Sequence, residues 1–236
     1  LDVMVCTLSS EPIPGEVRLR WLQESFPAVS FIHVTEEIPA AARDQAGATQ
    51  IWADTVRRRL GEPPTHVFAS ETYGGALATQ LGAAFVAVDP PRTTVPVSAA
   101  EIRNDPFGMW EYILPVVRPY LTFRVLVTGS SSAVRDRYAA ELAVELDTMS
   151  VPDYRARIAG RSAERGPTQH DAMRVQAAAQ VAVEQRCSGI VILATQCDDP
   201  ELAPDFTVDA GMSVREAAER IRAVARPRHL QRSSGR

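Results

Sequence analysis

The stretch Asp89-Pro-Pro-Arg-Thr-Thr-Val-Pro-Val-Ser-Ala-Ala-Glu-Ile-Arg103 places a strand end, a proline-rich loop and a helix start next to one another. The apolar run from Phe85 to Val88, closed by Asp89, is typical of a buried strand. Three prolines are expected to keep the following residues extended, because the ring fixes φ and removes an N–H donor. The stretch therefore predicts a strand, an extended loop and a helix in direct succession.

The predicted helix starts with a capping box. Ser98 is the expected N-cap, and Glu101 three residues later completes the S-x-x-E pattern. A helix N-terminus offers unpaired N–H groups and the positive end of the helix dipole, which suit a phosphate group. Arg103 lies one turn further, where its guanidinium can hold the same anion through two hydrogen bonds. The residues alone favour a capped surface helix that carries an arginine, because capping boxes are common.

The residues before this stretch alternate between strand and helix patterns. Strands are predicted at 3–8, 29–34 and 66–70, and helices at 16–26, 49–60 and 75–81. Alternating strands and helices predict a parallel sheet that is covered on both faces. Ligands in such folds bind at the carboxyl ends of the strands, and the polar residues that fall there are Ser9, Glu71, Asp89 and Ser98.

A second strand–loop–helix unit begins at Phe123. A strand at 123–128, a loop at Gly129-Ser-Ser-Ser132 and a helix at 135–146 have the layout of a phosphate-binding P-loop. Further expected elements are a polar loop at 159–168, a helix at 169–186, a strand at 189–194 and a helix at 214–225. The chain is expected to contain two domains, residues 1–121 and 122–228, followed by a basic tail at 229–236.

Composition limits the class of protein. The chain has 236 residues, 45% of them apolar and 23% charged, which suffices for one or two packed domains. The net charge of −4 argues against nucleic acid as a partner. No apolar run approaches the ~20 residues that span a bilayer. The three cysteines are distant from one another and predict reduced thiols in a cytoplasmic protein. Every basic residue other than histidine is arginine, which excludes mechanisms that need lysine.

The string Val97-Ser98-x-x-x-Ile102-Arg103-x-Asp105-Pro106 resembles the S-x-T-x-I-R signature of the HIGH-type nucleotidyltransferases. More narrowly, it is similar to the nicotinamide-nucleotide adenylyltransferase half of a bifunctional bacterial NAD-salvage family, whose second half is a ribosylnicotinamide kinase. Other similar segments are 11–16 with 20–27, 70–74, and 106–120, the last resembling the closing helix of that domain. The resemblance is strong for residues 1–127 and weak beyond.

The resemblance implies a fold, a reaction and a set of binding residues. The fold is α/β, with a Rossmann-like nucleotidyltransferase domain followed by a P-loop kinase-like domain. The reaction transfers AMP from ATP, which carries Mg²⁺, to nicotinamide mononucleotide, giving NAD and pyrophosphate. Arg103 is the expected catalytic residue, and no protein ligands for a metal are expected. The nucleotide-binding residues would be Ser98, Ile102, Arg103, Asp89 and Arg92, and the substrate-binding residues Trp52, Glu71 and Tyr73.

The chain departs from the nucleotidyltransferase pattern in two places. Ala100 stands where the signature has threonine, which removes a hydroxyl from the phosphate site. The H-x-G-H element is absent, since all four histidines are isolated in the sequence. Leu1 falls on what resembles the second strand of the family, so we expect the chain to be a fragment of a longer protein whose first strand is missing.

The P-loop of the second unit is degenerate. Its pattern, G-x-x-x-x-G-K-[ST], needs a second glycine for backbone contacts to phosphate, a lysine for the β/γ oxygens and a hydroxyl for Mg²⁺. Gly129 is in register, but Val134, Arg135 and Asp136 stand in the other three positions. Three changes in one loop predict that the unit has no kinase activity.

The segments downstream of this loop point the same way. Val151-Pro-Asp-Tyr154 resembles a V-P-E-Y segment of the kinase family, which would make Asp153 the acid on the substrate side. Ala194 and Gln196 replace the two carboxylates of an Asp-Thr-Asp sequence, so the Mg²⁺ ligand is missing. Asp198 and Asp199 follow shortly afterwards and are the alternative ligands.

Several assignments stay open at the level of sequence. Trp52 can stack on a pyridine ring or belong to the core. Glu71 and Tyr73 can contact the ligand or form a tight turn, and Asp89 can orient Arg92, hold a ribose hydroxyl or cap its loop. Cys6 is expected to be buried and inert.

A second functional hypothesis competes with the enzyme. The chain can be a catalytically inactive paralogue that binds nucleotide as a sensor or interaction module. The preference for nicotinamide or nicotinate, and whether the protein forms a homo-oligomer, are open.

Overall fold

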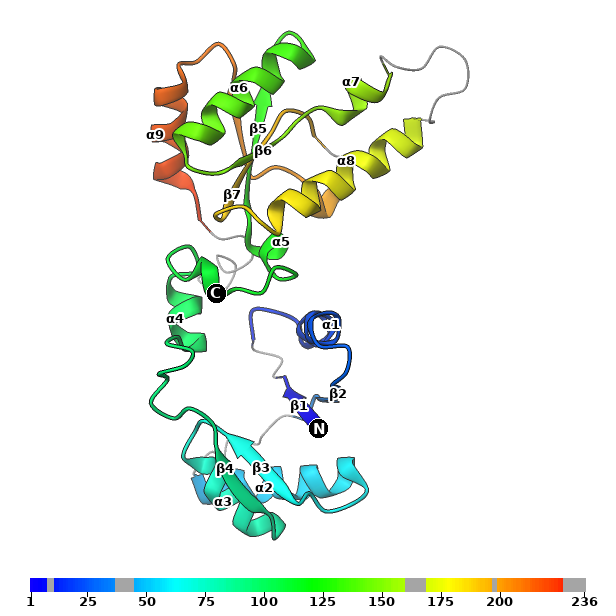
Figure 1. Ribbon diagram of the computed structural model, residues 1–236, viewed down its shortest axis with the longest axis vertical. Coiled ribbons are helices and arrows are strands. Elements are labelled where there is room, and N and C mark those ends of the chain that lie inside the picture. The colour runs from blue at the N-terminus through cyan, green and yellow to red at the C-terminus, as the bar shows by residue number, and fades with distance from the viewer. Residues whose placement is uncertain (8–10, 37–44, 160–168, 197–198, 227–236) are drawn as a thin grey trace. The chain divides into compact units, whose positions relative to one another are not determined.

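The computed structural model describes residues 1–7, 11–36, 45–159, 169–196 and 199–226 (Figure 1). Ser9, Cys197, Asp198, most of the expected loop at 159–168 and the expected basic tail lie outside the described residues. The chain divides into two compact units, Leu1–Ser98 and Ala99–Arg236, and each is described by itself. The functional boundary after residue 121 stays a prediction. The compact units divide earlier, after Ser98, because residues from 102 to 121 pack with the second unit.

The first unit alternates strands and helices as predicted. Its elements are β1 (Asp2–Cys6), α1 (Gly15–Ser25), β2 (Ser30–Val34), α2 (Gln45–Leu60), β3 (His66–Ala69), α3 (Tyr73–Leu81) and β4 (Ala84–Ala87). The strands pair in parallel, β1 with β2 and β3 with β4. The expectation of one sheet covered on both faces is wrong for the described residues, which form two separate two-stranded sheets.

Strand β4 lies where the sequence predicts it, but it is not buried. Phe85 is 41% exposed and Val88 just after the strand is 45% exposed. The strand is exposed because β3 is its only hydrogen-bonded neighbour among the described strands. Helix α3 covers part of Phe85: a Cβ on Gly74 would lie 2.6 Å from the Phe85 ring. Glycine at this position therefore lets the helix approach the strand.

The core of the first unit lies under α2 and α3. Ala53 and Val56 of α2 are buried together with Leu81 of α3, and Met4 of β1 packs against them. The spacing of Ala53, Val56 and Leu60 places one apolar stripe on the inner face of α2.

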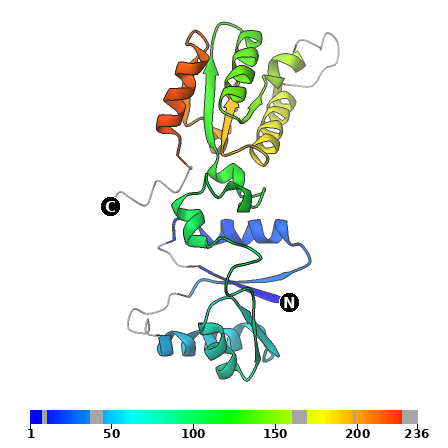
Figure 2. The ribbon, with the colours of Figure 1, turned by 60° about the vertical axis from the view of Figure 1, so that its left-hand side comes forward.

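The second unit carries a four-stranded parallel sheet in the order β6-β7-β5-β8. Its strands are β5 (Phe123–Thr128), β6 (Met149–Val151), β7 (Ile190–Leu193) and β8 (Phe206–Asp209). Its helices are α4 (Ala99–Asn104), α5 (Arg118–Leu121), α6 (Ser132–Glu145), α7 (Tyr154–Ala159), α8 (Gln169–Glu184) and α9 (Val214–Val224), with the 3-10 turns η2 (Trp110–Tyr112) and η3 (Pro200–Leu202). Figures 1 and 2 show the sheet between α6 and α9 on one side and α7 and α8 on the other.

Both faces of this sheet are packed. On the α6–α9 face the core includes Leu142 of α6, Ile221 of α9 and Val125 of β5, none of them exposed. On the other face Val183 of α8 packs against Val191 of β7. Parallel strands covered by helices on both faces confirm the expected α/β class for this unit.

The segment expected to form a closing helix at 106–120 does not do so. It contains the single turn η2 and the short helix α5, with irregular backbone between them. Pro115 and Pro119 explain the break, because a proline inside a helix removes a hydrogen bond and clashes with the preceding turn. Trp110 of η2 is buried against Leu121 and Cys187, and its indole N–H donates to the Cys187 carbonyl at 2.5 Å.

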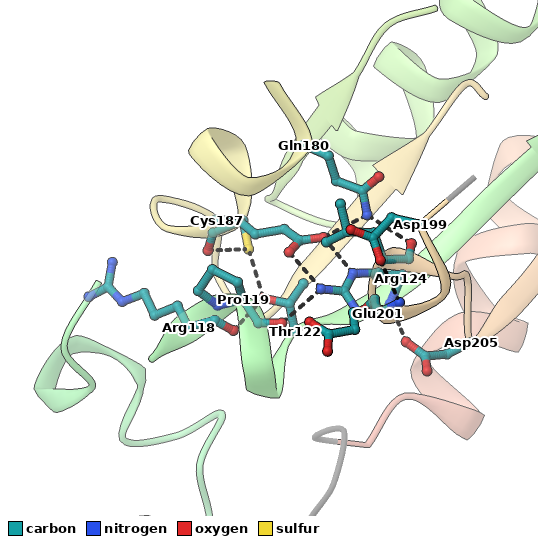
Figure 3. Close-up of polar contacts among 11 residues, drawn as sticks. Arg118, Pro119, Thr122, Arg124, Gln180, Cys187, Asp199, Glu201 and Asp205 are labelled. Carbon is teal, nitrogen blue, oxygen red and sulfur yellow. Dashed lines mark hydrogen bonds and ion pairs between the residues drawn. The ribbon is translucent and has the colours of Figure 1, made fainter. Parts of the chain in front are cut away.

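A buried ion pair holds the beginning of β5 to α8. The Arg124 guanidinium donates to both carboxylate oxygens of Glu184, at 2.5 and 2.7 Å, and the two side chains are 2% and 0% exposed. Figure 3 shows Arg124 among its further acceptors, the backbone carbonyls of Glu201 and Pro119. Gln180 donates to the same Glu184 carboxylate at 2.9 Å. The pair therefore joins β5, α8, α5 and η3 at one end of the sheet.

No helix in the described part of the chain is long and apolar enough to span a membrane.

Candidate nucleotide-binding site

The loop after β4 is organised by the Asp89 side chain. Its carboxylate accepts hydrogen bonds from the backbone N–H groups of Thr93 at 2.8 Å, Thr94 at 2.9 Å and Val95 at 3.1 Å, and from the Thr93 hydroxyl. The Val95 N–H bond is the largest cause that lowers the pKa of Asp89. The sequence left three roles open for Asp89, and the structure shows the one in which Asp89 caps its own loop. Among the described contacts, no side-chain bond joins Asp89 to Arg92.

The backbone of this loop turns sharply. Asp89 and Arg92 both have positive φ, 42° and 54°, and the Arg92 N–H donates to the Asp89 carbonyl at 2.9 Å. The prolines between them thus lie in a turn, and the predicted extended conformation is wrong there. Positive φ is costly for a side chain as large as arginine and is found where the surroundings enforce it, frequently at functional sites.

Arg92 is held at the carboxyl ends of β3 and β4. Its guanidinium pairs with Glu71 at 3.0 Å and donates to the Val97 carbonyl at 3.2 Å. The side chains of Arg92 and Glu71 remain 40% and 60% exposed. The structure therefore brings together three of the predicted site residues, Asp89, Arg92 and Glu71, on an exposed loop that follows two parallel strands.

The remaining signature residues lie around the start of α4. The helix begins at Ala99, directly after Ser98, as the capping pattern predicts. Ile102 packs against the Trp110 core, so its side chain is accounted for by packing. The Arg103 side chain is exposed and makes no hydrogen bond or ion pair with a described residue. Ser98 is the last residue of the first compact unit, and α4 belongs to the second.

The predicted pyridine-binding residues differ in their surroundings. Trp52 is half-buried on α2 and lies outside the hydrophobic core that Ala53 and Val56 form. Tyr73 opens α3 and is 52% exposed. Neither is a fully buried core residue, and both stay predictions as ligand contacts.

Cys6 is half-buried, where full burial was predicted. Partial burial at the end of β1 raises the pKa of its thiol, against the opposing effect of Arg18. Since the thiolate is the reactive form, the raised pKa is consistent with an unreactive cysteine.

The loop after β5, which the sequence predicts to be a degenerate P-loop, is arranged around Arg135. The helix starts at Ser132, earlier than predicted, because Ser131 caps it by accepting from the Val134 N–H. The Arg135 guanidinium donates to the carbonyls of Ala194 at 2.8 Å and Gly129 at 3.3 Å, and it pairs with Asp153 at 2.9 Å. These groups follow three different strands, β7, β5 and β6.

Asp136 is engaged in the same place. It accepts from the backbone N–H of Asp153 at 2.7 Å and pairs with Arg157 at 2.9 Å. Arg157 lies on α7, which the sequence did not predict, so this pair was missed. Asp199, an alternative Mg²⁺ ligand, caps η3 by accepting from the Glu201 N–H at 2.9 Å.

Metal-binding side chains are not clustered in the part of the chain that the structure describes. Within the described ranges no three His, Cys, Asp or Glu residues are placed to hold one ion. The carboxylates nearest to the β4 loop, Asp89 and Glu71, are bonded to the loop backbone and to Arg92.

Two of the curated relatives that match part of the chain carry the same name. They are the trifunctional NAD biosynthesis/regulator protein NadR of Salmonella typhimurium and that of Escherichia coli, each 28% identical over 151 residues. The chain resembles NadR. The match covers 62% of this chain and 37% of each relative, so the matched part of the chain spans well under half the length of these NadR proteins. No protein-family model matches the chain.

Two crystal structures of NadR share its fold. The complex with NAD and AMP-PNP has a TM-score of 0.53 at 17% identity and covers 98% of this chain and 68% of that chain. The complex with NR has a TM-score of 0.54 at 16% identity and covers 100% of this chain and 69% of that chain. The predicted resemblance and the predicted α/β class with parallel sheets are therefore confirmed, the latter at the level of fold.

Proposed function

We propose that the protein takes part in NAD biosynthesis by transferring AMP from ATP to nicotinamide mononucleotide, with NAD and pyrophosphate as products. Two relatives with this resemblance are named for NAD biosynthesis, and a NadR structure of similar fold holds NAD and AMP-PNP. The single observation that carries the proposal is the loop after β4, where Asp89 fixes a strained turn that presents Arg92 at the strand ends. Ligands of parallel α/β sheets bind at these ends.

The reaction needs positioning and charge stabilisation more than covalent chemistry from the protein. A phosphate oxygen of the mononucleotide attacks the α-phosphorus of ATP, and the bond from that phosphorus to the bridging oxygen of the β-phosphate breaks. Negative charge builds up on the leaving pyrophosphate. Ser98 and Arg103 are proposed to contact the β- and γ-phosphates. Arg103 suits this role because it is exposed and free of protein partners among the described residues.

The other predicted residues would position the second substrate. Arg92 is proposed to contact a phosphate after releasing Glu71, since both side chains are substantially exposed. Trp52 and Tyr73 are proposed to contact the pyridine ring. Mg²⁺ would arrive on the phosphates of ATP and neutralise their charge, because the nearby carboxylates are already bonded to the protein.

The assignment of Arg103 is tested by turnover. NAD formed from ATP and nicotinamide mononucleotide is measured by chromatography, with nicotinate mononucleotide as the second substrate to define the preference. Arg103→Ala should lower the rate at least tenfold, because a charged hydrogen bond contributes about 1.5–3 kcal/mol. Arg215→Ala is the matched control, since Arg215 is 86% exposed on α9. An unchanged kcat/KM for ATP in Arg103→Ala would remove the assignment.

A nucleotide-binding module without activity is the second candidate function. Ala100 in place of the signature threonine favours it, because a phosphate-binding hydroxyl is missing. Under this alternative the protein binds ATP but forms no NAD. In either case we expect no phosphorylation of ribosylnicotinamide, since Val134, Arg135 and Asp136 replace the residues that a P-loop kinase needs. A metal-dependent phosphorylation rate above that of a no-enzyme control would contradict this expectation.

A further inference from the structure

The carboxyl ends of β5, β6 and β7 are occupied by four charged side chains of the protein itself. We call Arg135, Asp153, Asp136 and Arg157 the Arg135 network. Its ion pairs are Arg135 with Asp153 at 2.9 Å and Arg157 with Asp136 at 2.9 Å. The Asp136 carboxylate also accepts from the Asp153 backbone N–H, which connects the two pairs. The network comprises two positive and two negative groups.

Arg135 stands at the position of the lysine that contacts the nucleotide phosphates in a working P-loop. In such a loop, backbone N–H groups and a lysine face the phosphates at the start of the first helix. Here Arg135 lies in the first turn of α6 and its guanidinium extends over the sheet to the Ala194 carbonyl after β7. It bonds to the Gly129 carbonyl and to Asp153 as well, so all three of its nitrogens are engaged.

Burial of the Arg135 and Asp153 side chains stabilises the Arg135 network. The side chains of Arg135 and Asp153 are only 22% and 6% exposed. Asp153 also accepts from the Ala156 N–H at 3.0 Å, so it caps α7 while it holds Arg135. Arg157 lies over the Tyr154 ring at 5.6 Å in addition to pairing with Asp136. Moving Arg135 would leave a nearly buried carboxylate without its charge partner, which is costly.

We propose that the Arg135 network is a built-in substitute for the nucleotide, which keeps the second unit closed to ADP and ATP. The positive charge of Arg135 is neutralised by Asp153 and that of Arg157 by Asp136, so neither arginine of the network is left to bind phosphates. Asp136, at the Ser/Thr position of the P-loop pattern, and Asp153, which bonds to Arg135, add negative charge beside the loop that faces the phosphates in a working P-loop. The inference is independent of the adenylyl transfer proposed for the β4 loop.

The test is hydrogen exchange of the full chain, followed by mass spectrometry, with ADP as the probe and without Mg²⁺. Peptides covering 129–136 report on the second unit, and peptides covering 89–103 report separately on the proposed adenylyl-transfer site. In the wild-type protein ADP should leave exchange in 129–136 unchanged, whatever happens at 89–103. Protection of wild-type 129–136 by ADP would overturn the proposal.

A variant that opens the network completes the test. Asp136→Asn with Asp153→Asn frees two arginines from their carboxylates, while asparagine at 153 can still cap α7. ADP should then protect 129–136, with binding at least about tenfold tighter than in the wild type, because charge-assisted bonds to phosphate become available. Glu216→Gln with Glu219→Gln is the matched control, since it removes two carboxylates from ion pairs with Arg220 and Arg215 on α9.

Each outcome decides the proposal. Protection of 129–136 in the opened variant, and not in the control, supports it. A folded opened variant whose 129–136 segment stays unprotected would overturn it. If the double variant does not fold, Asp153→Asn alone takes its place, with protection expected in the same segment and its absence counting against the network.

Discussion

The first prediction at the scale of single residues concerns Asp89 and how the protection of its loop from hydrogen exchange depends on pH. Hydrogen bonds from the Val95, Thr93 and Thr94 N–H groups lower the pKa of Asp89. A lowered pKa in the folded state means that the cap stabilises the loop above the ordinary aspartate pKa and is lost only when pH falls through the lower, folded value. On acidification past 3.8, the ordinary pKa, the amides of Thr93 to Val95 should therefore still be protected from exchange.

The matching variant is Asp89→Ala, in which protection of these amides should be lost at every pH. Asp54→Ala removes another aspartate with a lowered pKa, on α2, and should leave the same amides unchanged. Equal protection in Asp89→Ala and the wild type would show that the loop does not depend on its cap.

Arg124 gives the second prediction at this scale. Arg124→Met should lower the free energy of unfolding of the second unit by about 3–5 kcal/mol, because Glu184 would remain buried without a partner. Arg215→Met is the control: Arg215 and its partner Glu219 are 86% and 62% exposed, so the change should stay within about 0.5 kcal/mol. Urea unfolding measures both, and similar losses in the two variants would contradict the role of burial.

At this scale the sequence predicts where polar residues fall but not how they pair. The sequence places Asp89 at a strand end. It does not predict the turn with positive φ at Asp89 and Arg92, in which the Asp89 carboxylate accepts from three backbone N–H groups. The Arg124–Glu184 pair was missed, although an arginine inside the apolar run at 123–128 is a recognisable signal. Its partner lies 60 residues away, and no local pattern gives that pairing.

At the scale of a single element, the prediction concerns the buried and the exposed face of helix α6. Leu142 is fully buried in the main core of the second unit, whereas Val144, two residues later on the same helix, is 82% exposed. Leu142→Ala should cost about 2–5 kcal/mol of unfolding free energy through the lost apolar contact and the cavity. Val144→Ala should change it by less than about 0.5 kcal/mol. Urea unfolding decides between them, and equal effects would mean that α6 does not face the sheet as described.

The elements themselves were predictable where they are long. The helices α2, α6, α8 and α9 and the strand β5 are within a few residues of their expected positions, because apolar periodicity extends over several turns or a whole strand. Strand β6 has only three residues, which is too few for a pattern to stand out, whereas β8 was not predicted although β4 of the same length was. The closing helix at 106–120 was predicted from similarity to a family, although Pro115 and Pro119 lie inside the segment and oppose a continuous helix.

At the scale of the whole molecule, the division of the chain depends on contacts between distant residues. Trp110 donates to the carbonyl of Cys187, 77 residues later, and Arg118 donates to that of Gln185, 67 residues later. These contacts place 102–121 with the second compact unit, while the similarity to nucleotidyltransferases predicts a functional boundary after 121. Sequence patterns mark where elements begin and end, but they do not show which of two neighbours an element packs against.

The last prediction follows from this division. A fragment of residues 99–236 should unfold cooperatively, because it keeps both faces of the sheet and the Trp110 core. A fragment of residues 122–236 should be less stable by at least about 3 kcal/mol, since removing one large buried aromatic residue already costs that much. It also loses the Pro119 carbonyl, one of the acceptors of the buried Arg124. Urea unfolding of the two fragments, with Trp110→Ala in the longer one to isolate the contribution of the indole, measures the difference. Equal stability would place the structural boundary at residue 121, because 99–121 would then contribute nothing to the unit it contacts.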